Sequence, residues 1–173
     1  MEIEMGRAEL TIRPAGEADR HLLEDLIAEC YATVYPGWYD NDLLDEALPA
    51  MLKVDPKLLT SGRYLLAEFD NKIAGCGGWS AGPPGKETSE HAVGHIRHFA
   101  TDPELMGKGV GGTILDHCVR EAAVSGLAKL KCFSSLPAEG FYARHGFAKI
   151  EQVNVMLGES VYFPAVLMEK YLG

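Results

Sequence analysis

The stretch that most constrains the fold runs from Ile96 to Gly112 and reads IRHFATDPELMGKGVGG. Its first residues are apolar enough for a buried strand, and Pro103 marks a turn directly after that strand. A glycine-containing loop follows and opens a helix whose apolar residues recur at helical spacing. A strand, a turn and a helix therefore have to follow one another within this short segment. Its glycines are Gly107, Gly109, Gly111 and Gly112.

These glycines give the start of the helix the properties of an anion-binding site. The first backbone N–H groups of a helix have no partner within it and lie at the positive end of its dipole. Glycine allows a ligand to approach the backbone closely and tolerates a positive φ. Lys108 adds a positive charge beside the loop. The segment therefore indicates a phosphate-bearing cofactor.

Length and composition are those of one globular domain over residues 1–173. A chain of 173 residues, 47% hydrophobic and 24% charged, can bury an adequate core without disulfides or metal ions. The cysteines are scattered through apolar segments, as is typical of reduced core thiols. No apolar run approaches the roughly 20 residues of a membrane span, and the polar first residues do not resemble a signal peptide. We therefore expect a cytoplasmic protein without membrane association.

The charge of the chain limits its partners. The net charge of -9 and the pI near 5.1 argue against a nucleic-acid-binding surface. The same acidity mildly favours a cationic partner such as an amine.

The hydrophobic pattern predicts a mixed order of strands and helices. Besides the strand that begins at Ile96, strands are predicted at 9–13, 63–69, 72–79, 127–133, 147–156 and 161–169. Helices are predicted from Glu17, from Asp40, from the glycine loop and from Ala138. The segment at 82–90 has the composition of a loop, and Pro164 suggests that the last strand lies at a sheet edge. We expect an α/β fold with a mixed sheet flanked by helices.

Two common phosphate-binding motifs do not fit the glycines. The P-loop requires a glycine five residues before Gly107 and Ser or Thr after Lys108, but Asp102 and Gly109 occupy these positions. The dinucleotide-binding pattern GxGxxG is matched literally by Gly107, Gly109 and Gly112. In that fold, however, the first glycine follows the strand directly and an acidic residue closes the next strand, and neither holds here.

The segments FATDPELMGKGVGG and FYARHGF resemble the GNAT superfamily of acyl-CoA-dependent N-acyltransferases. The pyrophosphate loop of that family, [RQ]xxGx[GA], is matched from Met106 to Gly111, with Met106 in place of Arg or Gln. The second signature is matched by Phe141, Tyr142 and the Gly146–Phe147 turn. The resemblance implies a central, mostly antiparallel sheet of about six or seven strands with about four helices.

The resemblance also implies direct attack of an amine on the thioester of acetyl-CoA, with CoA leaving as the thiolate. It assigns the pantetheine arm and the thioester to the end of the central strand, where a backbone amide polarises the carbonyl. It assigns the pyrophosphate to the glycine loop. The implied cofactor-binding residues are Phe99, Ala100, Thr101, Gly107, Lys108, Gly109, Val110, Gly111 and Gly112.

For catalysis, the resemblance implies that Tyr142 protonates the leaving thiolate. A phenol is protonated at neutral pH and can donate to a sulfur beside it. The alternative is a tyrosine that only packs in the core.

The implied position of a general base is His95, counted back from the pyrophosphate loop. Histidine suits this role because its ordinary pKa is about 6.5. His98 is the rival, strand alternation places it on the opposite sheet face, and a water chain is a third solution. A metal site of these two residues with His91 is excluded by the same alternation and by the strand rise.

The resemblance places the acceptor beside the loop between the first two helices, where Trp38 and Tyr39 lie. Their rings can hold a cation by cation–π attraction, with Asp40 and Asp42 adding negative potential. Alternatively, the two aromatic side chains plug the edge of the core.

We therefore expect an N-acetyltransferase that acts on a primary amine of a small molecule. The alternatives are a protein N-terminal or lysine acetyltransferase and a CoA-binding module without turnover. Because members of the family often dimerise, a homodimer is compatible with the resemblance.

Overall fold

The computed structural model describes residues 2–5, 8–81 and 92–173, which form one eight-stranded sheet and five α-helices. The loop expected at 82–90 and His91 lie outside the described residues. The strands are β1 (Glu2–Met5), β2 (Ala8–Pro14), β3 (Tyr64–Phe69), β4 (Lys72–Ser80), β5 (Val93–Thr101), β6 (Lys129–Ser134), β7 (Ala148–Leu157) and β8 (Val161–Tyr171).

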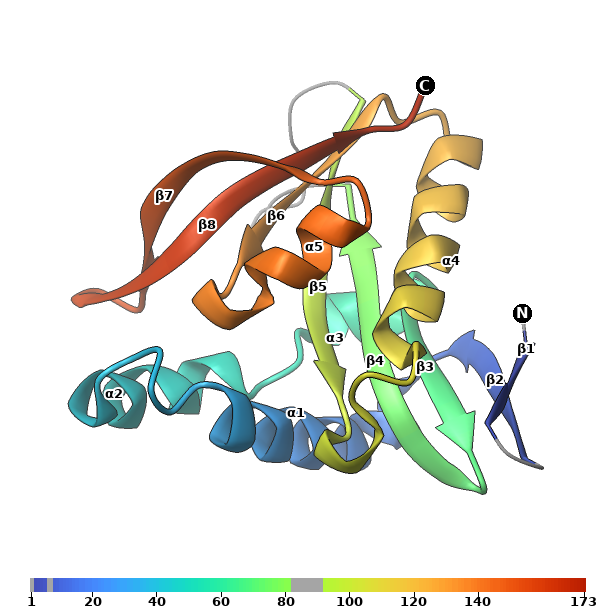
Figure 1. Cartoon of the computed structure of the whole chain (residues 1–173), viewed down its shortest axis with the longest axis horizontal. Helices are drawn as coiled ribbons and strands as arrows, with labels where there is room; N and C mark the ends of the chain where they lie inside the picture. Colours follow the sequence, from blue (N-terminus) through green and yellow to red (C-terminus); the bar gives the residue numbers. More distant parts are fainter. Residues whose placement is uncertain (1, 6–7, 82–91) are drawn as a thin grey trace.

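The strands lie in the order β1-β2-β3-β4-β5-β6-β8-β7 (Figure 1). Neighbouring strands are antiparallel except for the parallel pair of β5 and β6. The chain between these two strands contains a helix, as a parallel connection requires. The predicted fold class, an α/β fold with a mixed and mostly antiparallel sheet, is confirmed.

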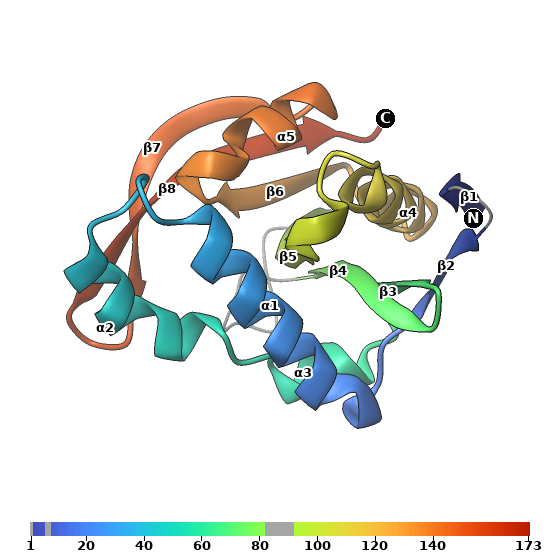
Figure 2. The same cartoon turned by 60° about the horizontal axis from the view of Figure 1, so that its bottom comes forward.

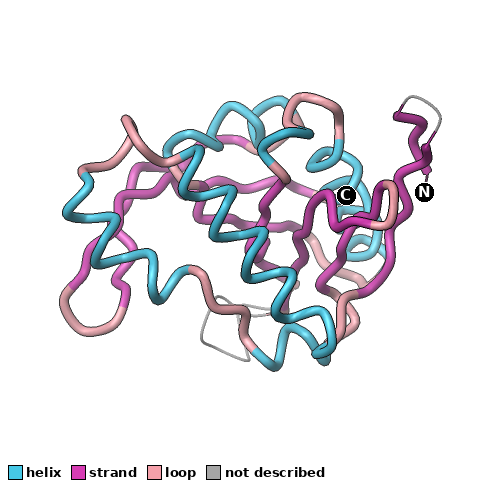
Figure 3. The backbone as a smooth tube through the Cα atoms, turned by 90° about the horizontal axis from the view of Figure 1, so that it is seen from below, coloured by secondary structure: helices cyan, strands magenta, loops and turns pink. Residues whose placement is uncertain are grey.

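Helices cover both faces of this sheet (Figure 2). Three of them lie on one face, and in the view from below α1 runs across the strands (Figure 3). The other two lie on the opposite face. The helices are α1 (Arg20–Val34), α2 (Asn41–Met51), α3 (Pro56–Thr60), α4 (Val110–Val124) and α5 (Glu139–Arg144).

Each face of the sheet has its own core of apolar side chains. On the face of α1, Leu23 and Ile27 pack with Tyr64 and Leu66 of β3. The α4 face contains Ile114, Leu115 and Cys118 of the helix and Leu130 and Val166 of the sheet. The alternation of apolar residues along the strands therefore supplies two hydrophobic surfaces. All four cysteines are buried free thiols.

The sequence pattern does not predict two short elements, β1 and α3. β1 extends the sheet by pairing with β2. α3 has only five residues, too few for an apolar repeat, but its start carries a recognisable pair. Asp55 accepts the N–H of Lys57 at 2.9 Å and Pro56 occupies the first turn.

The expectation that Pro164 marks an edge strand is wrong. β8 lies between β6 and β7, and β7 is the edge strand. Pairing with β6 begins only at Val166, whereas Pro164 pairs with Asn154 of β7. Proline is tolerated here because this end of β8 extends beyond β6 and needs no ladder bond on that side.

A β-bulge interrupts β5. The register with β4 shifts between Cys76 and Gly78, so that His98 and Phe99 lie opposite Gly77. His98 has a φ of 47°, in the left-handed region. A bulge of this kind adds one residue to a strand and re-aims the side chains that follow it.

The expected placement of His95 and His98 on opposite faces is wrong, because alternation does not continue through the bulge. The His98 ring lies edge-on to Tyr64, with 6.5 Å between the ring centroids, in the core beneath α1. On the same face, Arg97 approaches Asp55 of the segment before α3. His95 precedes Arg97 by two residues and therefore shares its face.

Candidate functional site

The glycine loop has the backbone conformation that anion binding requires. Gly107 and Gly109 have φ values of 78° and 86°, and Gly109 is the N-cap of α4. A side chain at either position would be strained in this region of φ. The first hydrogen bond of the helix runs from the Thr113 N–H to the Gly109 carbonyl at 3.0 Å. The amides of residues 110–112 therefore precede the helical ladder and lie at the positive end of the dipole.

A close contact joins the start of α4 to α5. A Cβ atom at Gly112 would lie 2.7 Å from Nε2 of His145, so only glycine leaves room for this imidazole. His145 is fixed from the other side, where Nδ1 is 2.9 Å from the carbonyl oxygen of Phe141. The helix that carries the second sequence signature thus packs directly on the helix that carries the first.

One cavity of about 740 Å³ connects these features. Its wall includes the glycine loop, the second half of β5, the inner side of α5, the last turns of α1 and part of β8. β5 and β6 pair only from Val93 to His95 on the β5 side, so the following part of β5 has no partner there. The cavity thus opens where the two parallel strands part.

The structure places most of the predicted cofactor-binding residues at this cavity. Phe99, Ala100 and Thr101 line it, as do the glycine loop and Val110. Lys108 is exposed and does not form part of the wall. Met106, the residue that departs from the family pattern, lines the cavity and is 38% exposed.

Tyr142 lies in the wall of the cavity and is buried. Its ring is edge-on to Phe99, with 6.3 Å between centroids, and edge-on to Phe141 and Phe147. Burial raises the pKa of Tyr142 well above 10, and the neighbouring Cys132 thiol adds to the shift. The hydroxyl group is therefore protonated at physiological pH.

The two histidine candidates for a general base are placed differently. His98 lines the cavity, whereas His95 is buried outside the residues that form the wall. Burial and, to a smaller extent, the positive charge of Arg97 lower the pKa of His98 to about 4. The His98 carbonyl accepts the hydroxyl of Tyr64 at 2.8 Å. His98 is therefore neutral at physiological pH.

Neither of the predicted acceptor-binding aromatic residues lines the cavity. Trp38 is 56% exposed. Tyr39 is buried and bridges two segments, because its hydroxyl accepts the Leu136 N–H at 2.8 Å and donates to the Pro164 carbonyl at 2.8 Å. Its ring stacks on Phe163, with 4.2 Å between centroids.

Tyr31 and Tyr35 form this part of the wall instead. They are stacked on consecutive turns of the helical segment, with 4.5 Å between ring centroids. Their spacing of four residues places both on one helix face. The sequence pattern predicts only that this face is buried in the core and not that it lines a cavity. Burial raises the pKa of both hydroxyls.

Arg97 is a further polar residue of the wall that sequence reasoning did not single out. Its side chain is only 8% exposed. Nη1 donates to the Ser80 hydroxyl at 3.3 Å, and Nη2 lies 3.9 Å from Oδ2 of Asp55. Burial lowers the pKa of the guanidinium group, against the effect of Asp55.

Within residues 2–5, 8–81 and 92–173, no cluster of three or more His, Cys, Asp or Glu side chains is arranged to hold a metal ion. In the same part of the chain, no helix is both long and apolar enough to cross a membrane.

Comparison with known proteins gives one family. The model of the acetyltransferase (GNAT) family matches residues 21–147. A comparison with curated proteins gives no match.

Solved structures of the same fold are similar over nearly the whole chain. A GCN5-related N-acetyltransferase from Rhodopseudomonas palustris is 19% identical, with a TM-score of 0.72 over 94% of this chain and 95% of that one. The PaiA N-acetyltransferase from Thermoplasma acidophilum, solved with coenzyme A, is 16% identical, with a TM-score of 0.71 over 94% and 98%. The protein Rv2747 from Mycobacterium tuberculosis, solved with CoA and NLQ, is 19% identical, with a TM-score of 0.60 over 94% and 99%.

Proposed function

Because the chain belongs to the acetyltransferase (GNAT) family, we propose that it transfers the acetyl group of acetyl-CoA to a primary amine of a small molecule. Membership of the family makes the protein an acetyl-CoA-dependent acyltransferase. The proposal concerns the acceptor class and the residues that perform the reaction. It treats residues 1–173 as one N-acetyltransferase domain.

The donor site in this proposal is the glycine loop with the adjoining part of β5. The amides at the start of α4 hold the pyrophosphate, with backbone groups of Phe99, Ala100 and Thr101 along the pantetheine arm. The left-handed glycines and the cavity wall at β5 support this assignment. Two structures of the same fold contain coenzyme A, which agrees with it.

In the proposed reaction, the nitrogen of the neutral amine attacks the thioester carbon and forms the C–N bond. The backbone amide at Phe99 stabilises the negative charge on the carbonyl oxygen. The C–S bond then breaks, and Tyr142 protonates the leaving thiolate. The buried, neutral phenol in the cavity wall supports this role. The proton lost by the amine passes to His95, to His98 or to water.

A single observation carries the proposed acceptor class. One cavity of about 740 Å³ extends from the glycine loop past Tyr142 to a wall formed by Tyr31, Tyr35 and Phe163. This volume lies within the range of small-molecule sites, about 300–1,000 Å³. The arm of CoA and a compact amine fit such a space better than an extended peptide does.

The first test is thermal stability of the protein with acetyl-CoA or NAD. A ligand that binds only the native state at a hundredfold excess over Kd adds about 2.7 kcal/mol, which gives a clear shift in Tm. We expect a shift with acetyl-CoA alone. A shift with NAD alone would contradict the donor assignment.

The second test is release of CoA thiol from acetyl-CoA in the presence of single amines or of peptides. We expect turnover with small primary amines. Faster turnover of peptides through their N-terminus or lysine side chains would replace the small-molecule proposal by a protein acceptor. Stabilisation by acetyl-CoA without turnover of any amine or peptide would instead support a CoA-binding module. We also expect a cytoplasmic location, which fractionation would test. Light scattering would show whether the protein forms the homodimer that the resemblance allows.

A further inference from the structure

The cavity contains a buried cation whose charge is incompletely neutralised. Arg97 lies on β5 before the bulge and is 8% exposed. A guanidinium group has five N–H donors. Within the described residues, its hydrogen bond to Ser80 is 3.3 Å long and its nearest carboxylate oxygen, on Asp55, is 3.9 Å away. These contacts use at most two of the five donors, and Arg97 is among the residues that line the cavity.

Asp55 is a poor counter-ion for Arg97 because it already serves another function. Its Oδ1 accepts the Lys57 N–H at the start of α3, and its side chain is 34% exposed to solvent. A long, partly solvated ion pair of this kind compensates little of the cost of burying a guanidinium group.

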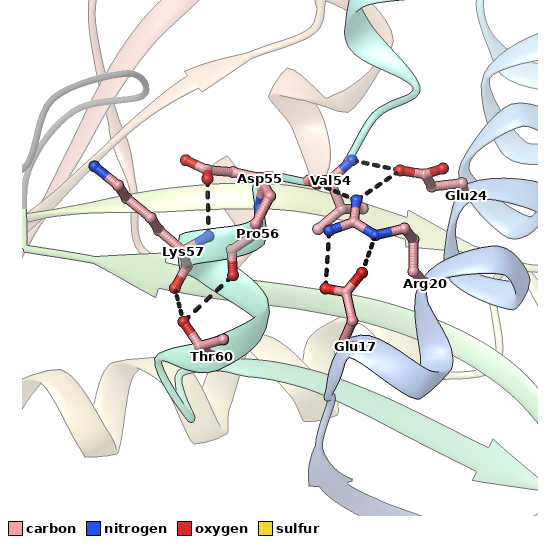
Figure 4. A network of polar contacts seen from close by, with 8 residues as sticks. All are labelled: Glu17, Arg20, Glu24, Val54, Asp55, Pro56, Lys57 and Thr60. Atoms are coloured by element: carbon pink, nitrogen blue, oxygen red, sulfur yellow. Dashed lines mark hydrogen bonds and ion pairs between the residues drawn. The ribbon is translucent and has the colours of Figure 1, made fainter.

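The position of Asp55 is fixed by a network at the segment before α3 (Figure 4). Arg20 of α1 donates to the Val54 carbonyl at 2.6 Å, and Glu24 accepts the Val54 N–H at 2.9 Å. Arg20 is itself paired with Glu17 and Glu24. The network therefore anchors the backbone beside Asp55 to α1.

The other ionisable side chains of the wall do not supply a negative charge. Arg144, His98 and His145 line the cavity, and no described Asp or Glu side chain does. This is notable in a chain with a net charge of -9. A doubly cationic acceptor would meet Arg97 without a compensating carboxylate, which costs free energy where the charges are partly removed from water.

The two arginine residues of the wall lie at different ends. Arg144 is on α5, next to His145, which contacts the start of α4. Arg97 pairs with Gly78 and the last residue of β5, Thr101, pairs with Gly75, so the two lie three ladder positions apart, roughly 10 Å at the rise of a strand. Arg144 is therefore near the proposed phosphate site, and Arg97 lies on the other side of Phe99 along β5, beyond the proposed position of the thioester.

We propose that the acceptor carries a carboxylate group as well as the amine, as an amino acid does, and that Arg97 binds this carboxylate. A planar guanidinium group can form two parallel hydrogen bonds with a carboxylate, which fixes the acceptor with its amine toward the thioester. The inference rests on the proposed function and adds a substrate class to it. It replaces the expectation of a purely cationic amine.

The test compares acceptors that differ only in the carboxylate. Alanine is paired with ethylamine and with alaninamide, and phenylalanine with phenethylamine and phenylalaninamide. Acetyl-CoA-dependent thiol release gives kcat/KM for each. We expect the carboxylate member of at least one set to be about 10- to 100-fold better, the ratio expected of a hydrogen-bonded charge pair. Equal or faster turnover of the uncharged partners in both sets would overturn the inference and leave the proposed function intact.

Variants assign the effect to one side chain. Arg97→Gln should abolish the preference by raising KM for the carboxylate member, while Arg97→Lys retains part of it. Arg144→Gln is the matched cavity control and should weaken acetyl-CoA binding while the acceptor preference stays. Arg120→Gln, at an exposed position on α4, is the surface control. An unchanged preference in Arg97→Gln would exclude Arg97 as the residue that binds the carboxylate. If that variant does not fold, the comparison of acceptors with the wild-type protein still decides the substrate class.

Discussion

Tyr142 of α5 lies edge-on to Phe99 of β5, with 6.3 Å between the ring centroids. The contact joins the two parts of the chain that carry the separate sequence signatures. It places the phenol beside the strand segment whose register is shifted by the bulge. The proposed proton donor and the proposed oxyanion amide thus belong to residues in ring contact.

Replacing Tyr142 with Phe tests the assignment of the acid. The variant keeps the ring contacts and removes only the hydroxyl group. We expect kcat to fall by about 100-fold or more, the usual range for loss of a general acid. The Kd for CoA, measured by calorimetry, should change little because the glycine loop is untouched.

The matched control is Tyr31→Phe, which removes another buried hydroxyl from the same cavity wall, on α1 instead of α5. If Tyr142→Phe retains wild-type kcat, the tyrosine only packs and water protonates the thiolate. Equal losses in both variants would indicate a general effect on the cavity.

The backbone geometry of the proposed donor site was predictable from sequence because it depends on glycines at defined positions. Glycines between a predicted strand and a predicted helix can be identified directly in the sequence. The same holds for the Phe-Tyr pair before Gly146. The sheet class followed from hydrophobic periodicity, which also gave most of the strands. Short elements such as α3 were not predicted because they contain too few residues to show a helical repeat of apolar residues.

The proposed acceptor part of the cavity was not predictable because its wall depends on tertiary contacts. A β-bulge changes the direction of the His98 and Phe99 side chains, and no residue pattern in β5 predicts this bulge. Tyr35 and Tyr39 are both aromatic and close in sequence, yet one lines the cavity and the other ties the loop to β8. Arg97 looks like an ordinary exposed strand residue until Asp55 and Ser80 are placed around it.

Replacing Gly109 with Ala should weaken both stability and donor binding. The φ of 86° is left-handed, which costs an L-residue about 1–2 kcal/mol. We expect a lower urea midpoint and a higher KM for acetyl-CoA, because strain moves the amides at the start of α4. Gly16→Ala is the control, since Gly16 has a φ of -133° and a Cβ there would meet no atom within 4 Å. Equal behaviour of the two variants would contradict the left-handed requirement.

Replacing Tyr39 with Phe should lower stability. The change leaves the Leu136 N–H and the Pro164 carbonyl without their hydroxyl partner. A buried polar group without a partner costs about 1–3 kcal/mol, so urea unfolding should show a loss in that range. Tyr162→Phe, on a side chain that is 55% exposed, should change the free energy of unfolding by less than about 0.5 kcal/mol. A similar small effect at Tyr39 would mean that water replaces the hydroxyl.

The identity of the base can be read from the pH dependence of kcat/KM. A general base must be deprotonated, so the rate falls as the pH falls through its pKa. With His98 as the base, the acidic limb lies near pH 4 and disappears in His98→Gln. With His95 as the base, the limb disappears in His95→Gln and survives in His98→Gln. Retention of the limb in both variants would favour water as the proton acceptor.

His98 should also make stability depend on pH in a defined window. Burial lowers its pKa from 6.5 to about 4, so the unfolded chain binds the proton at a higher pH than the folded chain does. Between these values the unfolded state gains a proton that the native state excludes, and the free energy of unfolding falls as the pH falls. Arg97 strengthens the effect, whereas Asp55 and Glu24 oppose it.

The full shift corresponds to about 3 kcal/mol at 1.36 kcal/mol per pKa unit. Urea unfolding at several pH values between 7 and 4, with wild type and His98→Gln, measures it. Other groups titrate equally in both proteins, so the difference between the two curves isolates His98. We expect wild type to lose stability relative to the variant as the pH falls from 6.5 toward 4. Parallel curves would mean that His98 takes up its proton in the folded state, and the ring would then be accessible to water through the cavity.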